Sequence, residues 1–167
     1  MARSAKILVA LVLCCSLLSG CASLIPEDMA DQVLTFDDLT ISLPVYFEDM
    51  TNTGNPIPTE GFFVYGYSEI MITGLRDDKS LFETVPTLEE YGKTLIAQSE
   101  VTTELEIIDG MTTFTYYQLY NNESYTYIAF LFEGTDSFWM VQAGCKTMNF
   151  KYVQEKLFEI CKTIRVA

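Results

Sequence analysis

The sequence predicts an α+β fold with a central antiparallel sheet and helices on its faces. Segments with alternating polar and apolar residues follow one another through short turn sequences, as in antiparallel strands. Two segments have apolar residues at helical spacing, one over residues 87–98 and one from about 149 to 162. Strands joined by short turns, with helices segregated from them, indicate an antiparallel sandwich.

The chain opens with the parts of a secretory signal peptide. Arg3 and Lys6 precede an apolar stretch over residues 7–18, which as a helix would be about 18 Å long. The hydrocarbon core of a membrane is about 30 Å thick, so this stretch is too short for a stable transmembrane helix. A basic flank, a short apolar centre and small residues after it are typical of a cleaved leader.

The end of this leader resembles the lipobox of bacterial lipoproteins, with Leu18, Ser19 and Gly20 before Cys21. The resemblance implies cleavage after Gly20, so that residues 1–20 are a lipoprotein signal peptide, and diacylglycerol and fatty acyl groups such as palmitate on Cys21. Two or more acyl chains hold a protein stably at a membrane. We therefore expect an extracytoplasmic protein that is lipid-anchored to the bacterial cell membrane. An ordinary secreted protein cleaved nearby is the alternative.

After the leader we expect a tether and one domain. Residues 21–36 hold Pro26 and several acids without clear periodicity, which favours a flexible acidic tether that spans on the order of 20 Å. Residues 37–167 are 131 residues, the usual size of a single domain.

The chain is strongly acidic. Its net charge of −13 becomes −15 without residues 1–20, which hold two basic residues and no acid. Residues 21–136 hold 21 acidic residues against three basic ones. Such a surface repels nucleic acid and anionic lipid, so nucleic acid is not an expected partner.

The first half of the domain begins with strands. Residues 39–44 alternate apolar and polar side chains and end at Pro44, which predicts a half-buried strand. Residues 51–61 are rich in Asn, Gly and Pro and predict an irregular loop. Residues 62–67 and 70–74 predict two short strands.

A capping box then predicts the start of the first helix. Thr87 and Glu90 have the spacing at which each side chain satisfies the other's backbone N–H group. Leu88, Tyr91, Leu95 and Ile96 share one face of this helix, which should end near Gln98.

A meander and a second helix follow. Residues 102–108 should pair with 111–120 across Asp109-Gly110, a dipeptide suited to a two-residue hairpin turn. Turns then lead into strands at 125–132 and 138–143. The last helix carries an apolar stripe of Phe150, Val153, Leu157, Ile160 and Ile164.

Cys145 and Cys161 are expected to be buried free thiols. The helix between them would separate its ends by about 18 Å. Bridged cysteines have Cα atoms only about 4.4–6.8 Å apart.

The layout of these elements resembles the PsbP-like superfamily. The resemblance lies in the opening strand LTISLP, the capped helix TLEEYGKTL, the aromatic meander and the ending FWMVQAGCKTMNFKYVQEKLFEICKTIRV. That superfamily includes the Ran-binding import factor of yeast and bacterial lipoproteins of the DcrB type. The resemblance implies an α/β/α sandwich around a curved antiparallel sheet, and a role as an accessory or protein-binding module.

Little in the sequence points to catalysis, to a cofactor or to a metal site. The chain has no histidine, which excludes Ser-His-Asp and Cys-His nucleophiles and histidine-based metal sites within it. Helix capping explains the acidic pair 89–90, and turns and solvation explain the pairs 37–38 and 77–78. The other acids lack the alternating spacing of a calcium loop.

Aromatic residues form the most suggestive surface feature. Three successive predicted strands carry Tyr116, Tyr117, Tyr120, Tyr125, Tyr127 and Trp139. Strand alternation sends Tyr117 to one face and Tyr116 and Tyr120 to the other, with Tyr125 and Tyr127 together on one face. Tyrosine and tryptophan are common binding anchors, so Tyr117, Tyr125, Tyr127 and Trp139 are the candidate binding surface. The alternative is that helices cover both faces of the sheet and these rings lie in the core or at its rim.

The sequence thus predicts a non-catalytic binding or accessory module for an unknown extracytoplasmic protein or envelope component. A small-ligand binding lipoprotein with a pocket in the sandwich is one alternative. A carboxylate-dependent hydrolase is the other.

Overall fold

The computed structural model describes residues 31–51, 61–66, 70–99 and 101–167. Two helices lie within these residues, α2 (Leu88–Gln98) and α3 (Thr147–Cys161), together with a 3-10 turn at Lys79–Leu81. The strands are β1 (Asp31–Phe36), β2 (Leu39–Pro44), β3 (Glu48–Asp49), β4 (Gly61–Gly66), β5 (Ile70–Asp78), β6 (Glu106–Ile108), β7 (Met111–Tyr120), β8 (Glu123–Glu133), β9 (Ser137–Lys146) and β10 (Arg165–Val166).

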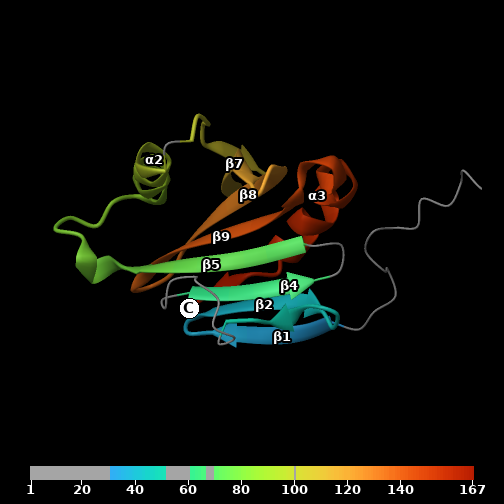
Figure 1. The fold of residues 1–167 in the computed structure, drawn as a ribbon. Helices are drawn as coiled ribbons and strands as arrows, with labels where there is room; N and C mark the ends of the chain where they lie inside the picture. The colour runs from blue at the N-terminus through green and yellow to red at the C-terminus, as the bar shows by residue number, and fades with distance from the viewer. Residues whose placement is uncertain (1–30, 52–60, 67–69, 100) are drawn as a thin grey trace, which may run out of the picture.

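The strands form two antiparallel sheets. A seven-stranded sheet has the order β3-β4-β5-β9-β8-β7-β6, and a three-stranded sheet has the order β1-β2-β10 (Figure 1). The predicted α+β class with a central antiparallel sheet is confirmed. The strand LTISLP, however, lies at the centre of the smaller sheet and not in the larger one.

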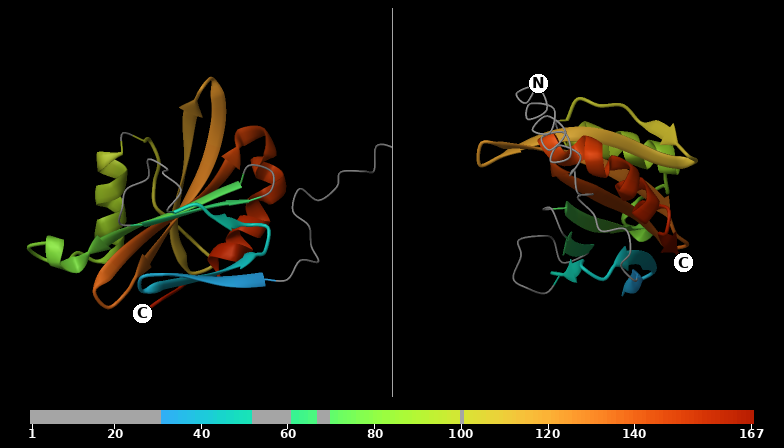
Figure 2. Two further views of the ribbon diagram at one scale, coloured as in Figure 1. Left: turned by 60° about the horizontal axis from the view of Figure 1, so that its bottom comes forward. Right: turned by 90° about the vertical axis from the view of Figure 1, so that its right-hand side faces the viewer.

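The two faces of the large sheet are covered differently (Figure 2). One face, here called the α3 face, packs against α3 and β2 and contributes Ile128, Phe130 and Val141 to the main core. The opposite face, here called the α2 face, packs against α2 through a smaller cluster that includes Phe114 and Leu131. Because α2 is only 11 residues long, it covers only one end of its face.

Both ends of α2 lie where the sequence predicts them. Thr87 Oγ1 accepts a hydrogen bond from Glu90 N at 3.2 Å, and Glu90 Oε2 accepts one from Thr87 N at 2.8 Å, so the capping box is confirmed. The Thr87 backbone N–H and its hydroxyl both donate to the Glu90 carboxylate, and these two hydrogen bonds lower the pKa of Glu90. The helix ends at Gln98, as expected.

The predicted turn at Asp109-Gly110 is also confirmed. Both residues have positive φ, 52° and 80°, as a tight hairpin requires. The strand before it begins at Glu106 and not near residue 102, so it pairs with β7 over three residues only.

The predicted tether over residues 21–36 is wrong for its last six residues, which form β1 and pair with β2 along its whole length. Leu34 and Phe36 pack against the core, whereas Val33 is exposed. Because the exposed residue Val33 is apolar, residues 31–36 do not alternate between polar and apolar side chains. The sequence pattern therefore does not predict this strand. The domain therefore includes Asp31, while residues 21–30 lie outside the described residues.

Asp38 joins the small sheet to the large one. Its carboxylate accepts hydrogen bonds from Ser137 Oγ at 2.6 Å, Trp139 Nε1 at 2.7 Å and Arg76 Nε at 3.4 Å. The sequence reading of residues 37–38 as a solvated turn is therefore right only for Asp37, whose side chain is exposed. Burial works to raise the pKa of Asp38, but the hydrogen bonds from Ser137 and Trp139 and the charge of Arg76 outweigh it and lower the pKa.

Cys145 and Cys161 are buried and free, as expected. Burial raises the pKa of the Cys145 thiol to about 11. Neither α2 nor α3 is long and apolar enough to span a membrane.

We expect Asp38→Asn to lower the free energy of unfolding by about 1–3 kcal/mol at neutral pH, because an amide cannot accept from all of these buried donors. The low pKa of Asp38 also means that its contribution is present at neutral pH and is lost as the pH falls below the ordinary value of 3.8. Urea unfolding between pH 7 and about pH 2 measures both effects, and the pH dependence should flatten in the variant.

The matched control is Asp37→Asn, one residue away. Asp37 has φ 55°, which asparagine tolerates, and its ion pair with Arg76 is exposed, so the loss should stay below about 1 kcal/mol. Equal losses in the two variants would contradict the role given to Asp38.

Candidate functional site

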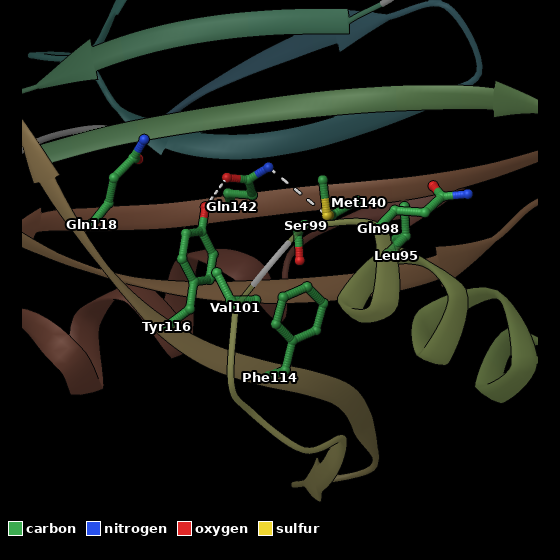
Figure 3. Close-up of a pocket in the computed structure, with 9 residues that line it drawn as sticks. All are labelled: Leu95, Gln98, Ser99, Val101, Phe114, Tyr116, Gln118, Met140 and Gln142. Atoms are coloured by element: carbon green, nitrogen blue, oxygen red, sulfur yellow. Dashed lines mark hydrogen bonds between the residues drawn. The ribbon is translucent and has the colours of Figure 1, made fainter.

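A groove of about 420 Å³ opens between the C-terminal end of α2 and the α2 face of the sheet (Figure 3). Its apolar wall comes from Leu95 on α2, from Val101, and from Phe114 and Met140 on the sheet. The capping box at Thr87 and Glu90 fixes the start of α2, and the helix ends 11 residues later at Gln98. The groove lies where the helix stops and the sheet continues.

Polar side chains line the rest of the groove. Gln98 and Ser99 come from the end of α2, and Gln118 comes from β7. At the sheet, the Tyr116 hydroxyl donates a hydrogen bond to Gln142 Oε1, which holds the Gln142 amide in one orientation (Figure 3). Among the described residues, Gln142 Nε2 donates only to the Met140 sulfur at 3.8 Å, a weak acceptor. The groove therefore offers an amide N–H group to a carbonyl or hydroxyl oxygen.

The described residues that line the groove carry no formal charge. An ion that enters among them would lose water without a counter-charge, so they favour a neutral occupant. Burial raises the pKa of Tyr116, which therefore stays protonated at neutral pH and cannot act as a general base there. These side chains can bind through apolar contact and hydrogen bonds. Among the described residues there is also no cluster of three potential metal ligands.

A row of tyrosines continues from the groove across the sheet. Tyr116 stacks on Tyr127 with ring centroids 5.2 Å apart, and Tyr127 stacks on Tyr125 at 6.4 Å. Tyr116 and Tyr127 are cross-strand partners, so the ladder between β7 and β8 sets this row. Gly144 on β9 lies opposite Tyr127, and a Cβ there would approach the Tyr127 ring to 2.5 Å. Gly144 thus makes the room in which the middle ring lies.

The four residues of the predicted binding surface do not lie together. Tyr125 and Tyr127 belong to the tyrosine row. Tyr117 is 69% exposed but lies on the α3 face, one residue out of phase with Tyr116. Trp139 is 1% exposed and donates its indole N–H to Asp38, so its inclusion in a binding surface is wrong. On β9 it shares the α3 face with Val141, and that face is the main core.

Sequence reasoning missed the groove itself. Gln142 was its one visible signal, since it is the only polar residue in the otherwise apolar run FWMVQAGC. Polar residues in buried strands need partners, and here the partner is Tyr116. The lipobox residues Leu18, Ser19, Gly20 and Cys21 lie outside the part of the chain that the structure describes, and the lipid on Cys21 stays a prediction.

A second hollow of about 630 Å³ lies on the other side of α2, lined by residues that include Glu89, Lys93, Glu104 and Ile107. Lys93 is already paired with Glu89 at 2.5 Å, and both side chains are exposed. Thr103 also lines this hollow, but its hydroxyl already donates to the Thr115 carbonyl at 2.7 Å. The groove, with its oriented Gln142 amide, is therefore the stronger candidate site.

No family model matches this sequence, and no curated protein matches it. Solved structures do resemble it. The Ran-binding protein Mog1p of Saccharomyces cerevisiae has a TM-score of 0.56 at 11% identity, over 83% of this chain and 96% of that chain. The cyanobacterial PsbP of Synechocystis sp. has a TM-score of 0.54 at 12% identity, over 90% and 99% of the two chains.

A protein from Bacteroides thetaiotaomicron has a TM-score of 0.52 at 8% identity, over 84% of this chain and 49% of that chain. At such identities the likeness shows the fold alone. The chain has the PsbP-like fold that the sequence predicted, and the comparisons assign it no site residue.

We expect Tyr116→Phe to lower the free energy of unfolding by about 1 kcal/mol at neutral pH, because Gln142 loses its donor. Burial raises the pKa of Tyr116 above the ordinary 10.0, so the unfolded chain releases this proton first as the pH rises. The stability that Tyr116 contributes is present below about pH 10 and is lost above it. Urea unfolding from pH 8 to about pH 11 should show a shallower alkaline fall in the variant.

Tyr91→Phe provides a second measurement, since burial and the hydrogen bond to Asp77 also raise the pKa of Tyr91. The double variant should lose more of the alkaline fall than either single one. An unchanged fall in Tyr116→Phe would show that this ring is not held protonated by the fold.

Proposed function

We propose that the chain is a lipid-anchored extracytoplasmic module that binds a protein or an envelope component without catalysis, and that its groove and tyrosine row form the binding site. One observation carries the proposal. The groove combines an apolar wall with an oriented amide at Gln142, and its described lining offers no ionised acid or base.

The tyrosine row supports a macromolecular partner. A groove of about 420 Å³ takes one or two side chains, whereas the rings of Tyr116, Tyr127 and Tyr125 extend the surface along the sheet. Tyrosines offer apolar area with a polar tip at small entropic cost, which suits protein recognition. The solved Mog1p structure is named as a Ran-binding protein, which is consistent with protein binding by this fold and gives no specific partner.

The proposed location, at a membrane outside the cytosol, is argued from the sequence alone. The basic flank, the apolar stretch and Cys21 behind Gly20 support a lipid anchor outside the cytosol. The anchor would keep the binding domain at a membrane surface, where its negative charge opposes contact with anionic lipid.

The binding site can be tested with a photo-crosslinking residue at position 118 in the native host. Gln118 is exposed at the rim of the groove, so a partner in the groove should give a covalent product of defined mass. Gln154 is the matched control, because it is an exposed glutamine on α3, on the far side of the sheet. The same product at both positions, or none at position 118, would count against the groove.

The anchor is tested by mass spectrometry of the protein from the host membrane. We expect a mature chain that begins at Cys21 with added diacylglycerol and acyl mass. Cys21→Ser should keep the leader and carry no lipid. An unmodified thiol at Cys21 in the natural product would refute the anchor.

A small neutral ligand is the second candidate, because about 420 Å³ lies within the roughly 300–1,000 Å³ range of ligand pockets. A thermal-shift screen of uncharged carbonyl compounds tests it. A ligand of the groove should raise the melting temperature with concentration in the wild-type chain. The shift should vanish in Gln142→Leu, which removes the oriented amide.

A further inference from the structure

The outer edge of β7 is largely unpaired in the described structure. Over Thr112–Tyr120, β7 pairs with β8. On its other side it pairs with β6 only over Met111–Thr113. The rest of β7 runs on into a hairpin with β8 that projects beyond the body of the sheet (Figure 2).

The backbone groups of alternate residues point to this open edge. Tyr120 and Glu123 flank a two-residue turn, so Tyr120 bonds inward to β8 and Leu119 points outward. The same alternation places the Thr115 carbonyl outside, where it accepts a hydrogen bond from Thr103 Oγ1 at 2.7 Å. Tyr117 and Leu119 therefore present their N–H and C=O groups at the edge, beyond the last residue that β6 or Thr103 engages.

This edge lacks the usual protection against strand pairing. Natural edge strands carry charges, prolines or bulges that stop other strands from adding. Residues 111–120 hold no charged residue and no proline, and they are rich in Thr, Tyr and Phe, which favour strands. At the tip, Tyr117, Leu119 and Tyr120 are 69%, 72% and 64% exposed. The edge is thus both free and apolar.

We propose that β7 binds an extended segment of a partner protein as an added antiparallel strand along Tyr117–Tyr120, and that this segment is uncharged where it pairs and basic at the end beside Glu104 and Glu106. Backbone hydrogen bonds to Tyr117 and Leu119 hold the segment. Its side chains alternate between the α2 face, beside Gln118, and the α3 face, beside Tyr117. The inference rests on the proposed protein-binding function but does not need the groove.

The acidic residues beside the edge favour a basic segment of another protein over a second copy of this chain. Glu104 and Glu106 are exposed, and within the described residues no cation pairs with either. They lie beside the Thr113–Thr115 end of the edge, through the Glu106–Thr113 pair and the Thr103 hydrogen bond. A second copy of this chain, added antiparallel, would bring its own uncharged turn at residues 121–122 to that end, where it would offer Glu104 and Glu106 no basic residue. It would also bring a second net charge of −13. A basic segment would instead be attracted by the carboxylates of Glu104 and Glu106.

The test uses the full chain in detergent micelles and two fluorescent peptides, Lys-Thr-Val-Thr-Val-Thr-Lys and its counterpart with Glu at both ends. Fluorescence anisotropy should show binding of the Lys peptide and at least about tenfold weaker binding of the Glu peptide. Equal affinities, or no binding of the Lys peptide, would overturn the proposal.

The key variant is Leu119→Pro, with Leu119→Ala as its control. Proline removes an outward N–H group that β8 does not use, so the β7–β8 ladder keeps its hydrogen bonds while the edge is blocked. We expect Lys-peptide affinity to fall at least about tenfold in Leu119→Pro and less than about threefold in Leu119→Ala. Equal affinity in Leu119→Pro and the wild type would overturn strand addition.

A second measurement does not depend on how the proline variant folds. N-methylation of the peptide amides along one edge should abolish binding to the wild-type chain, whereas methylation along the other edge should not. If neither methylated peptide loses affinity, no strand is added. If sedimentation shows a wild-type dimer and a Leu119→Pro monomer, the occupant is a second copy and the proposal is wrong.

The groove variant Gln142→Leu separates this inference from the proposed site. It should bind the Lys peptide like the wild type. Crosslinking from position 98, which lines the groove on α2 and not on β7, that fails while the peptide binds would remove the groove and leave the edge. Peptide binding that is lost in Gln142→Leu but kept in Leu119→Pro would assign the peptide to the groove and overturn the edge.

Discussion

The Asp38 carboxylate joins the two sheets over the shared apolar core, and the exposed surfaces of the fold follow from how those sheets pack. Asp38 lies in the turn between β1 and β2, yet it accepts hydrogen bonds from Ser137 and Trp139 on β9 and from Arg76 on β5. A buried indole N–H group needs an acceptor, and Asp38 Oδ1 accepts from Trp139 Nε1 at 2.7 Å. The small sheet closes the main core in the register that brings Asp38 to Trp139. With β1, β2 and α3 packed there, the α3 face is covered except at the projecting hairpin, where Tyr117 is exposed. The rest of the open surface lies on the opposite face.

That open surface follows from a mismatch in length. The helix α2 has 11 residues, while β7, β8 and β9 have 10 or 11 residues at more than twice the rise of a helix per residue. The helix ends long before the strands beneath it do. Beyond the end of α2, side chains on this face contact one another and not a helix. Tyr116 donates a hydrogen bond to Gln142, and the Tyr127 ring packs over Gly144. The groove and the tyrosine row therefore lie on the part of the α2 face that the short helix does not cover.

The sequence predicted those parts of the fold that local chemistry decides. Thr87 with Glu90 placed the start of α2, Asp109-Gly110 placed a hairpin, and helical spacing placed α3, which begins after Cys145 and ends at Cys161. It failed where a residue's role depends on a distant partner. Trp139 looked like a binding anchor because its acceptor lies 101 residues earlier, and residues 31–36 looked like a tether because β2 and the core give them their regular structure. Gln142 showed itself as one polar residue in an apolar strand, but only the pairing of β7, β8 and β9 brings Tyr116 to it.

The small sheet has a consequence for how a newly made chain matures. β2 lies between β1, its neighbour in sequence, and β10, and Ser42 N donates to Thr163 Oγ1 across 121 positions. While the chain is still being synthesised, β1 and β2 are complete more than 100 residues before the segments that complete their sheet. Pairings so distant are slow to form, and until they form the hairpin of β1 and β2 exposes Leu39, Ile41 and Leu43 to solvent. Until the C-terminal segments join it, this apolar hairpin is exposed to aggregation and to chaperone binding.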